Sequence, residues 1–196
     1  MKQDIILAGV GGQGILSIAF VVDNAALKKG LEVKQAEVHG MAQRGGGVQS
    51  HLRLSDERIY SDLIPRGQAD MILSVEPLEA LRYLEYLGPA GMIISSRAPY
   101  LNIPDYPPLD NVLAEIGKVK KSLIVDSDKL AKEAGSSRTG NMVMLGAASP
   151  FLILEEADLK EFLRVLFGRR GESIVNANVK AFDLGRRAAL DRGLAL

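Results

Sequence analysis

The amino-terminal part of the sequence constrains the fold most, because it joins a short apolar run to a glycine-rich turn and a helical pattern. Residues 4–8 (DIILA) are mostly apolar, as in a strand that is buried on both faces. Glycines follow at once, and from Ile15 the apolar residues recur at helical spacing until residues 28–30 (KKG). Residues 33–38 predict a second strand. We therefore expect a β–α–β unit with parallel strands and a right-handed crossover.

The pattern changes after this unit. Residues 48–55 alternate between apolar and polar side chains, and residues 58–64 follow after a short turn at Asp56-Glu57. Two strands so close in sequence indicate an antiparallel hairpin rather than another crossover helix. We expect the hairpin to be inserted into an otherwise parallel sheet.

The remainder of the chain alternates between strand and helix patterns. Apolar runs predict strands over 71–75, 91–95 and 123–125. Helical spacing predicts helices that cover 77–87, the stretch from about 126 through 134, 141–148, 158–167 and 173–191. Residues 99–108 are expected to form an irregular surface loop, because they contain Pro99, Pro104, Pro107 and Pro108.

This order of elements predicts a single α/β domain over residues 1–196. A chain of 196 residues has one domain as its default and enough length for a proper core. We expect a Rossmann-like fold with three layers, in which a mostly parallel sheet carries the inserted antiparallel hairpin.

The amino-acid composition excludes several classes of function and partner. The chain has no cysteine, which excludes disulfides, thiol catalysis and iron–sulfur clusters held by its own thiolates. With only His39 and His51, a histidine-rich metal site is not expected. The 24 acidic and 24 basic side chains balance, so neither nucleic acid nor an anionic membrane is expected as a partner. No apolar run reaches the roughly 20 residues that cross a bilayer, and we expect a soluble, cytoplasmic protein.

A first glycine motif lies between the first strand and the first helix. Residues 9–14 (GVGGQG) fit G-x-G-x-x-G in the context that this fingerprint requires. Missing β-carbons let the backbone turn sharply, and the helix N-terminus faces an anion. The cofactor-binding candidates here are Gly11, Gly12, Gln13 and Gly14. Glu37 lies about where a ribose-binding acid would be expected, and the alternative is a tight turn without a ligand.

A second glycine stretch covers residues 37–47 (EVHGMAQRGGG). Its density of glycine is unfavourable unless the backbone must come close to something. Ordinary NAD-binding units do not follow their second strand with such a loop. The side chain of Arg44 offers a planar fork for phosphate or carboxylate, although it could instead be solvated on a hairpin connection. The candidates from this stretch are Gly40, Gln43, Arg44, Gly45 and Gly46.

Single polar residues complete the set of candidates. Ser50 follows the second glycine stretch, and Asn141 opens a helix after Thr139-Gly140. Both are candidates for ligand contacts, although Ser50 could face the sheet and Asn141 could act as a helix cap. His39 and His51 could titrate near neutral pH, but we expect positioning or packing roles. We expect neither a catalytic residue nor a metal ligand in this chain.

The motifs together resemble the small, beta subunits of indolepyruvate ferredoxin oxidoreductases. These are relatives of the gamma domains in pyruvate and 2-oxoglutarate:ferredoxin oxidoreductases. The resemblance runs from Asp4 to about Gly185, and its most specific part is the stretch 36–46. It is carried by DIILAGVGGQGIL, by AEVHGMAQRGG followed by V-x-S-H-x-R (48–53), by LIP (63–65) and by AD…EPLEALRYL (69–84).

The resemblance implies an oxidative decarboxylation carried out by a heteromeric complex. An aryl-2-oxoacid, coenzyme A and oxidised ferredoxin would give an acyl-CoA, carbon dioxide and reduced ferredoxin. Thiamine diphosphate, Mg²⁺ and the iron–sulfur clusters would belong to a large alpha subunit, with ferredoxin reached through the complex. This chain would hold no cofactor alone and would be inactive in isolation. When isolated, it could form a homodimer through the surface that its partner would cover, since exposed apolar patches often associate.

The composition and motifs of this chain agree with the assignment of the cofactors to a partner subunit. A chain without cysteine cannot ligate the clusters, and the sequence lacks a G-D-G with a downstream Asn that would hold a metal diphosphate. A glycine-lined helix N-terminus and Arg44 could supply donors to a phosphate of coenzyme A or to groups near the partner's thiamine. Two alternatives stay open: a free-standing NAD(P)-binding oxidoreductase, and a purely structural subunit.

Overall fold

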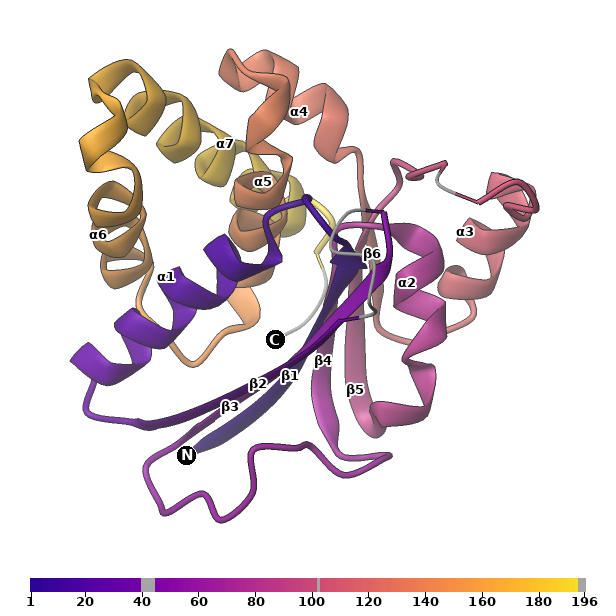
Figure 1. The fold of residues 1–196 in the computed structure, drawn as a ribbon, viewed down its shortest axis with the longest axis horizontal. Helices are drawn as coiled ribbons and strands as arrows, with labels where there is room; N and C mark the ends of the chain where they lie inside the picture. Colours follow the sequence, from indigo (N-terminus) through magenta and orange to yellow (C-terminus); the bar gives the residue numbers. More distant parts are fainter. Residues whose placement is uncertain (40–44, 102, 194–196) are drawn as a thin grey trace.

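A six-stranded sheet forms the centre of the molecule (Figure 1). The computed structural model describes residues 1–39, 45–101 and 103–193. The strand order across the sheet is β2-β3-β1-β4-β5-β6. The strands are β1 (Lys2–Val10), β2 (Glu32–His39), β3 (Gly47–Ser55), β4 (Ala69–Ser74), β5 (Leu87–Ser96) and β6 (Ser122–Val125).

The sheet is parallel over one half and antiparallel over the other. Strands β1, β4, β5 and β6 run parallel to their neighbours in that order. Strand β3 lies between β1 and β2 and is antiparallel to both. Strands β1 and β2 therefore run in the same direction, as predicted, but they are not neighbours. The predicted α/β class, with a mostly parallel sheet and an antiparallel insertion, is confirmed.

The predicted partner strand of the hairpin is wrong. Residues 58–64 form no strand, and the hairpin is instead made by β2 and β3. The register shows why, because β1 and β2 occupy both edges of β3, from Lys2↔Ser55 to Val10↔Gly47 on one side and from Glu32↔Ser55 to His39↔Val48 on the other. No edge of β3 is left to pair with a further strand.

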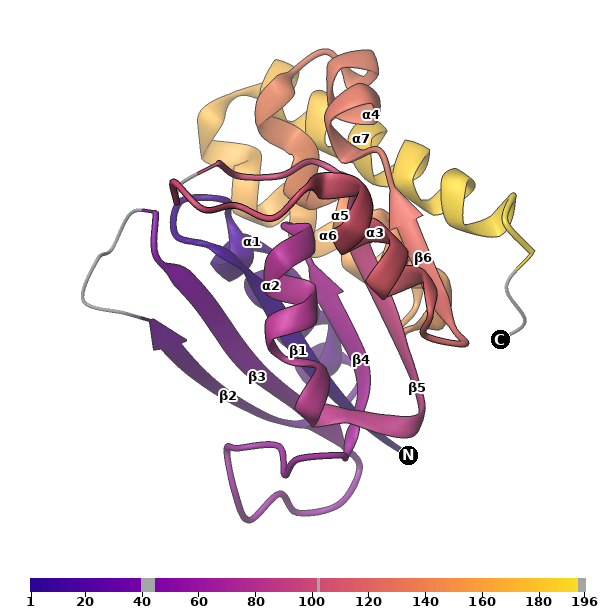
Figure 2. The ribbon, with the colours of Figure 1, turned by 90° about the vertical axis from the view of Figure 1, so that its right-hand side faces the viewer.

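Helices cover both faces of the sheet, which gives three layers. One face is covered by helices α1, α4, α5, α6 and α7, which pack over Leu7, Leu52 and Leu73. On the other lie α2 and α3, packed over Ile6, Ile72 and Ile93; Figure 2 shows them in front of β4 and β5. The bounds are α1 (Ile15–Lys28), α2 (Pro77–Arg82), α3 (Leu109–Gly117), α4 (Ser127–Ala134), α5 (Gly140–Ala148), α6 (Glu156–Phe167) and α7 (Glu172–Leu190).

Two helices differ from the prediction. The helix that begins at Pro77 ends at Arg82, and a short 3-10 turn leads directly into β5 at Leu87. Helix α3 was not predicted, because only Val112 and Ile116 of its nine residues are buried and a run of prolines precedes it. The helices α1, α4, α5, α6 and α7 are confirmed within a few residues.

Helices α5 and α7 cross in direct backbone contact. A β-carbon at Gly146 would overlap the backbone of Phe182, and one at Gly185 would overlap the backbone of Val143. Every residue from Met142 to Ala148 is buried. The tight crossing fixes α5 in the core, and with it the start of this helix at Gly140.

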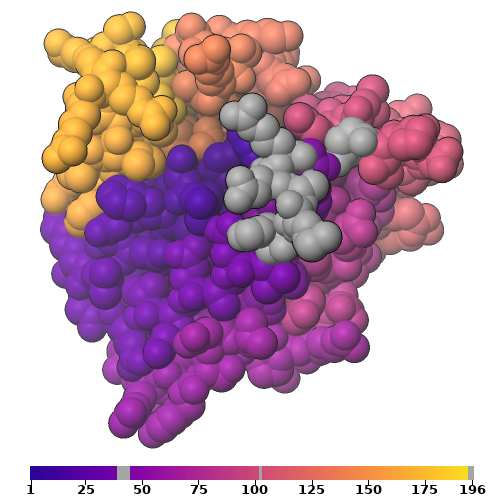
Figure 3. All heavy atoms as spheres, viewed as in Figure 1, coloured from indigo at the N-terminus to yellow at the C-terminus, as the bar shows by residue number. Residues whose placement is uncertain are grey.

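The carboxyl ends of β1, β4, β5 and β6 meet at one edge of the sheet. From β1 the chain leaves through α1 toward β2, whereas from β4 it leaves through α2 on the opposite face. Open α/β sheets bind ligands at such a reversal. In Figure 3 the indigo and purple part of the chain lies between the orange and yellow helices and the pink α3 region.

Candidate functional site

The two glycine stretches contact each other at the carboxyl edge of the sheet. The amide of Gly11 donates to the carbonyl of Gly46 at 2.9 Å, and the amide of Gly45 donates to the carbonyl of Gly11 at 3.4 Å. Because Val10 is paired with Gly47, the end of β1 lies beside the start of β3. The fold thus brings together glycine candidates that are more than thirty residues apart in sequence.

The turn before α1 needs glycine at two positions. Gly12 has φ +101° and Gly14 has φ +84°, a region that L side chains avoid. Gln13 closes the turn, since its Oε1 accepts from the Val10 amide at 2.7 Å. A β-carbon on Gly12 would meet nothing within 4 Å, whereas one on Gly14 would lie 2.5 Å from Nδ2 of Asn141.

Asn141 links the start of α5 to the first glycine loop. Its Nδ2 donates to the carbonyl of Gly14 at 3.2 Å, and its Oδ1 accepts from the Met142 amide at 3.0 Å. Helix α5 is fixed in the core by its crossing with α7, and through Asn141 it also fixes the turn before α1.

A first cleft of about 350 Å³ opens on the β2 side of this turn. It is lined by Val10, Gly11, Gly12, Gly14, Ile15, Leu16, Glu37 and Val48. One carboxylate oxygen of Glu37, Oε2, is buried and has no hydrogen-bond partner among the described residues. The cleft is thus apolar with a single acidic group at its side.

A second cleft of about 480 Å³ opens on the other side of the turn, at the ends of β4, β5 and β6. The amino-terminal ends of α4 and α5 open onto it, and Gln13 reaches it from the turn before α1. The first amides of a helix have no partner within the helix, and together with the helix dipole they favour an anion. The lining residues are Gly12, Gln13, Val75, Ala98, Pro99, Tyr100, Ser127, Asp128, Ser137, Arg138, Gly140 and Asn141.

Of the lining residues of the second cleft, the sequence predicted only Gly12, Gln13 and Asn141. Two of the residues that it missed, Arg138 and Tyr100, have large polar side chains. Arg138 is exposed beside the start of α5 and brings a cation next to the helix amides. Its proximity to Asn141 in sequence was a usable signal. Tyr100 belongs to the proline-rich loop that follows β5, far in sequence from the other candidates, so no local pattern could have found it.

Not every predicted residue reaches a cleft. Ser50 is fully buried in β3, where its Oγ accepts from Nε2 of Gln35 at 3.2 Å, and it lines neither cleft. Gly40, Gln43 and Arg44 lie outside the described residues, as does the side chain of His39. Over the described ranges, no group of three or more His, Cys, Asp or Glu residues could hold a metal ion.

His51 has a packing role. It is 2% exposed, its Nδ1 accepts from the Ile64 amide at 3.0 Å, and its ring makes a T-shaped contact with Tyr86, with the ring centroids 5.1 Å apart. Burial lowers the pKa of the imidazole, and the charge of Arg53 lowers it further. The expected packing role for this histidine is confirmed.

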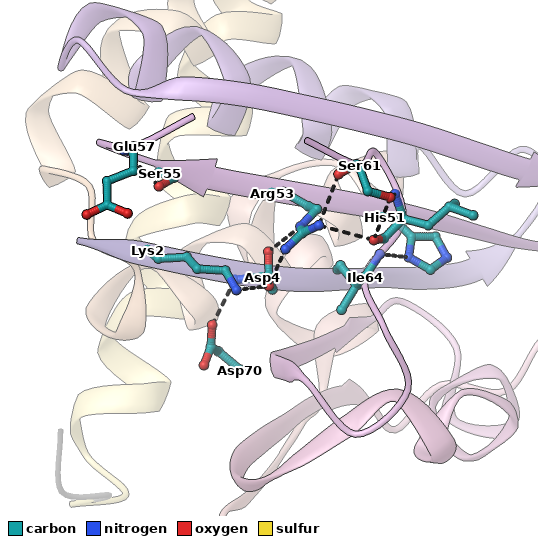
Figure 4. Close-up of polar contacts among 10 residues, drawn as sticks. Lys2, Asp4, His51, Arg53, Ser55, Glu57, Ser61, Ile64 and Asp70 are labelled. Carbon is teal, nitrogen blue, oxygen red and sulfur yellow. Dashed lines mark hydrogen bonds and ion pairs between the residues drawn. The ribbon is translucent and has the colours of Figure 1, made fainter. Parts of the chain in front are cut away.

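A buried ion pair holds Arg53, which lies two residues after His51 in β3 (Figure 4). Asp4 is fully buried and accepts from Nε and Nη2 of Arg53 at 2.8 and 3.2 Å. The same guanidinium donates through Nη1 to the carbonyls of Ser61 and Leu63 at 3.0 and 3.2 Å. The loop over 58–64 is therefore held to β3 by side chains, without a strand ladder.

A family model described as "Pyruvate ferredoxin/flavodoxin oxidoreductase" matches residues 4–188. The chain belongs to this family. It is 40% identical over 200 residues to indolepyruvate oxidoreductase subunit IorB of Pyrococcus horikoshii, covering 96% of this chain and 97% of the relative.

Solved structures of relatives share the fold. The 2-oxoglutarate:ferredoxin oxidoreductase of Magnetococcus marinus, solved with 2-oxoglutarate, coenzyme A and succinyl-CoA, gives a TM-score of 0.75 at 27% identity. That match covers 99% of this chain but only 32% of the other, so this chain corresponds to about a third of that chain. Subunit PORC of pyruvate oxidoreductase from Thermotoga maritima, 21% identical, gives 0.73 over 95% of this chain and 96% of that one.

The topology also separates this fold from a dinucleotide-binding unit. In the Rossmann arrangement the second strand lies next to the first, which places its terminal acid near the ribose. Here β3 lies between β1 and β2, and Glu37 is on the edge strand. No helix within the described part of the chain has the length and apolar character needed to span a membrane.

Proposed function

We propose that this chain is the small subunit of an indolepyruvate-type 2-oxoacid:ferredoxin oxidoreductase that acts in the cytoplasm. The complex would convert an aryl-2-oxoacid, coenzyme A and oxidised ferredoxin into an acyl-CoA, carbon dioxide and reduced ferredoxin. The observation that carries this proposal is the match to IorB subunits over nearly the whole of both chains.

The chemistry is divided between subunits. Because the chain contains no cysteine, the iron–sulfur clusters must be ligated by the partner. We assign thiamine diphosphate, Mg²⁺ and the contact with ferredoxin to the same large subunit. The contribution of this chain is then to bind and orient a substrate at the cofactor that the partner supplies.

We assign coenzyme A to the glycine turn and the second cleft. The ends of α4 and α5 and the open space beside Gly12 offer donors to phosphate groups, and the cation of Arg138 offsets the acidic Asp128 in the same lining. The solved Magnetococcus relative binds coenzyme A, which supports this ligand class. Arg44 is expected to add a second guanidinium from the neighbouring glycine stretch.

Reconstitution tests the proposed function. The chain alone, its large subunit alone and the mixture are assayed for ferredoxin reduction with indolepyruvate, with and without coenzyme A. We expect CoA-dependent turnover only from the mixture, and no change in nicotinamide fluorescence when the isolated chain is titrated into NADH or NADPH. Turnover by the isolated chain, or micromolar binding of a nicotinamide dinucleotide, would contradict the proposal.

Arginine variants test the ligand assignment within the complex. Arg138→Ala and Arg44→Ala should each raise the KM for coenzyme A about ten-fold, since each removes a charge-assisted contact to phosphate. Arg66→Ala is the matched control, because Arg66 is exposed in the loop before β4, at the opposite edge of the sheet. A purely structural subunit would instead show altered assembly and unchanged KM.

A further inference from the structure

The turn between β4 and α2 begins the EPLEALRYL segment and contains a buried carboxylate. Glu76 is 1% exposed. Its Oε2 accepts from the Glu79 amide at 2.8 Å and so caps α2, while its Oε1 accepts from the Tyr100 amide at 3.2 Å and from the Tyr106 hydroxyl at 2.6 Å. The Ser74 hydroxyl fixes the Glu76 backbone from the preceding strand.

Both tyrosines belong to the proline-rich loop between β5 and α3. Ala98, Pro99 and Tyr100 line the second cleft, whereas Glu76 does not. The Tyr106 ring packs against the core on the α2 side of the sheet. The Glu76 carboxylate therefore connects the loop that forms one wall of the second cleft to the start of α2.

Capping alone does not account for a glutamate at this position. Asp, Asn and Ser are the preferred N-caps, and each would cap α2 with a shorter side chain. Burying a charged group is costly unless it is well paired. The extra length of Glu76 is what brings Oε1 to the Tyr100 amide and the Tyr106 hydroxyl.

We propose that Glu76 is a positioning residue for the second cleft: through Tyr100 and Tyr106 it holds Pro99 and Tyr100 in place as the wall against which the ligand binds. The identity of that ligand, coenzyme A, rests on the proposed function, whereas the placement of the loop does not. The binding of coenzyme A then depends on a side chain that does not touch it.

Two variants separate the loop contacts from the helix cap. Glu76→Asp keeps a preferred cap for α2 but is too short to reach Tyr106, and Tyr106→Phe removes only the hydroxyl. Tyr60→Phe is the control, because Tyr60 is 86% exposed and lies far from the cleft, in the loop after β3. Each variant is assembled with the large subunit, and amide exchange over residues 97–101 is followed together with kcat and both KM values.

We expect Glu76→Asp and Tyr106→Phe to speed amide exchange at Tyr100 and to raise the KM for coenzyme A roughly five-fold, the size expected for one lost hydrogen bond to a charged group. We expect kcat and the KM for the oxoacid to stay unchanged, and Tyr60→Phe to match the unmodified complex in every measurement.

Unchanged exchange in both variants would overturn the positioning role. Faster exchange with an unchanged KM for coenzyme A would overturn the role in ligand binding, as would a rise in the oxoacid KM alone. Arg138→Ala in the same complex distinguishes the two failures. If it raises the KM for coenzyme A while Glu76→Asp does not, only the inference fails; if neither does, the assignment of coenzyme A to this cleft fails as well.

Discussion

The crossing of α5 with α7 and the turn before α1 both depend on glycine, but a side chain would meet different surroundings in each. At Gly146 and Gly185 a β-carbon would overlap the backbone of the other helix, although neither has a positive φ. At Gly12 the φ is +101° and a β-carbon would meet nothing within 4 Å. Glycine lets two backbones touch in the first region, and in the second it permits a sharp turn beside open space.

The comparison extends to the energetics of the two regions. The α5–α7 crossing is fully packed, with Phe182 and Met144 both 0% exposed. The other region, made by the turn before α1 together with α1 and β2, includes the positive φ values of Gly12 and Gly14. It also includes the carboxylates of Asp23 on α1 and Glu37 on β2, each with a buried oxygen that has no partner among the described residues. One region is built for stability, and the other retains features that cost stability, as binding sites commonly do.

The largest effect is expected at the helix crossing. Gly146→Ala or Gly185→Ala must separate the helices, and overpacking of this kind costs about 3 kcal/mol, or roughly 6–12 °C in Tm for a chain of this size. Thermal unfolding measures it. Gly117→Ala is the matched control, because Gly117 has nothing within 4 Å at the end of α3. If Gly146→Ala and Gly117→Ala melt alike, the proposed contrast between the regions is wrong.

An intermediate effect is expected at Gly14, where both demands meet. Gly14→Ala combines a positive φ with an overlap on Asn141, and we expect a loss of about 2 kcal/mol. A second substitution that removes the Asn141 side chain relieves its overlap with the new β-carbon, but it does not relieve the backbone strain of the positive φ. The double variant should therefore be more stable than the sum of the single effects by about 1 kcal/mol. Simple additivity, measured by denaturant unfolding, would show that the two residues do not compete for space.

A smaller effect, of opposite sign, is expected at Asp23 on α1. Burial raises the pKa of its carboxyl to about 7. The folded chain therefore binds a proton that the unfolded chain has lost, and the free energy of unfolding falls as the pH rises from about 4 to about 7. Asp23→Asn should remove this dependence and raise the Tm by roughly 2–4 °C at pH 7.5, with no gain at pH 4. This is less than the full pKa shift would give, because the side chain is only partly buried and solvent screens its charge. An equal gain at both pH values would contradict burial as the cause.

Much of the fold follows from local patterns in the sequence. The apolar runs of β1, β4 and β5 and the helical spacing of α1 and α7 are strong signals, since each element buries a regular set of side chains. The insertion of β3 between β1 and β2 could not be predicted in this way. Alternation shows which side chains share a face of the sheet, but it does not show which strands are neighbours. Residues 58–64 have a similar pattern and form no strand.

The candidate site divides in the same way. The glycine turn could be predicted, because positive φ values at Gly12 and Gly14 require the residue type that the sequence shows there. The roles of Tyr100 and Glu76 could not. They meet because the strand order brings the loops after β4 and β5 to one edge of the sheet, and no pattern within either loop records that meeting.

The most direct test is the dependence of acyl-CoA formation on coenzyme A in a complex assembled with Gly12→Ala. The added methyl group has room in the protein, so the variant should fold with a cost of only about 1–2 kcal/mol from backbone strain. It occupies the space that we assign to coenzyme A, and its KM for coenzyme A should rise at least about ten-fold, since loss of about 1.4 kcal/mol of binding has that effect. A folded, assembled variant with an unchanged KM for coenzyme A would show that the glycine turn does not form the binding site.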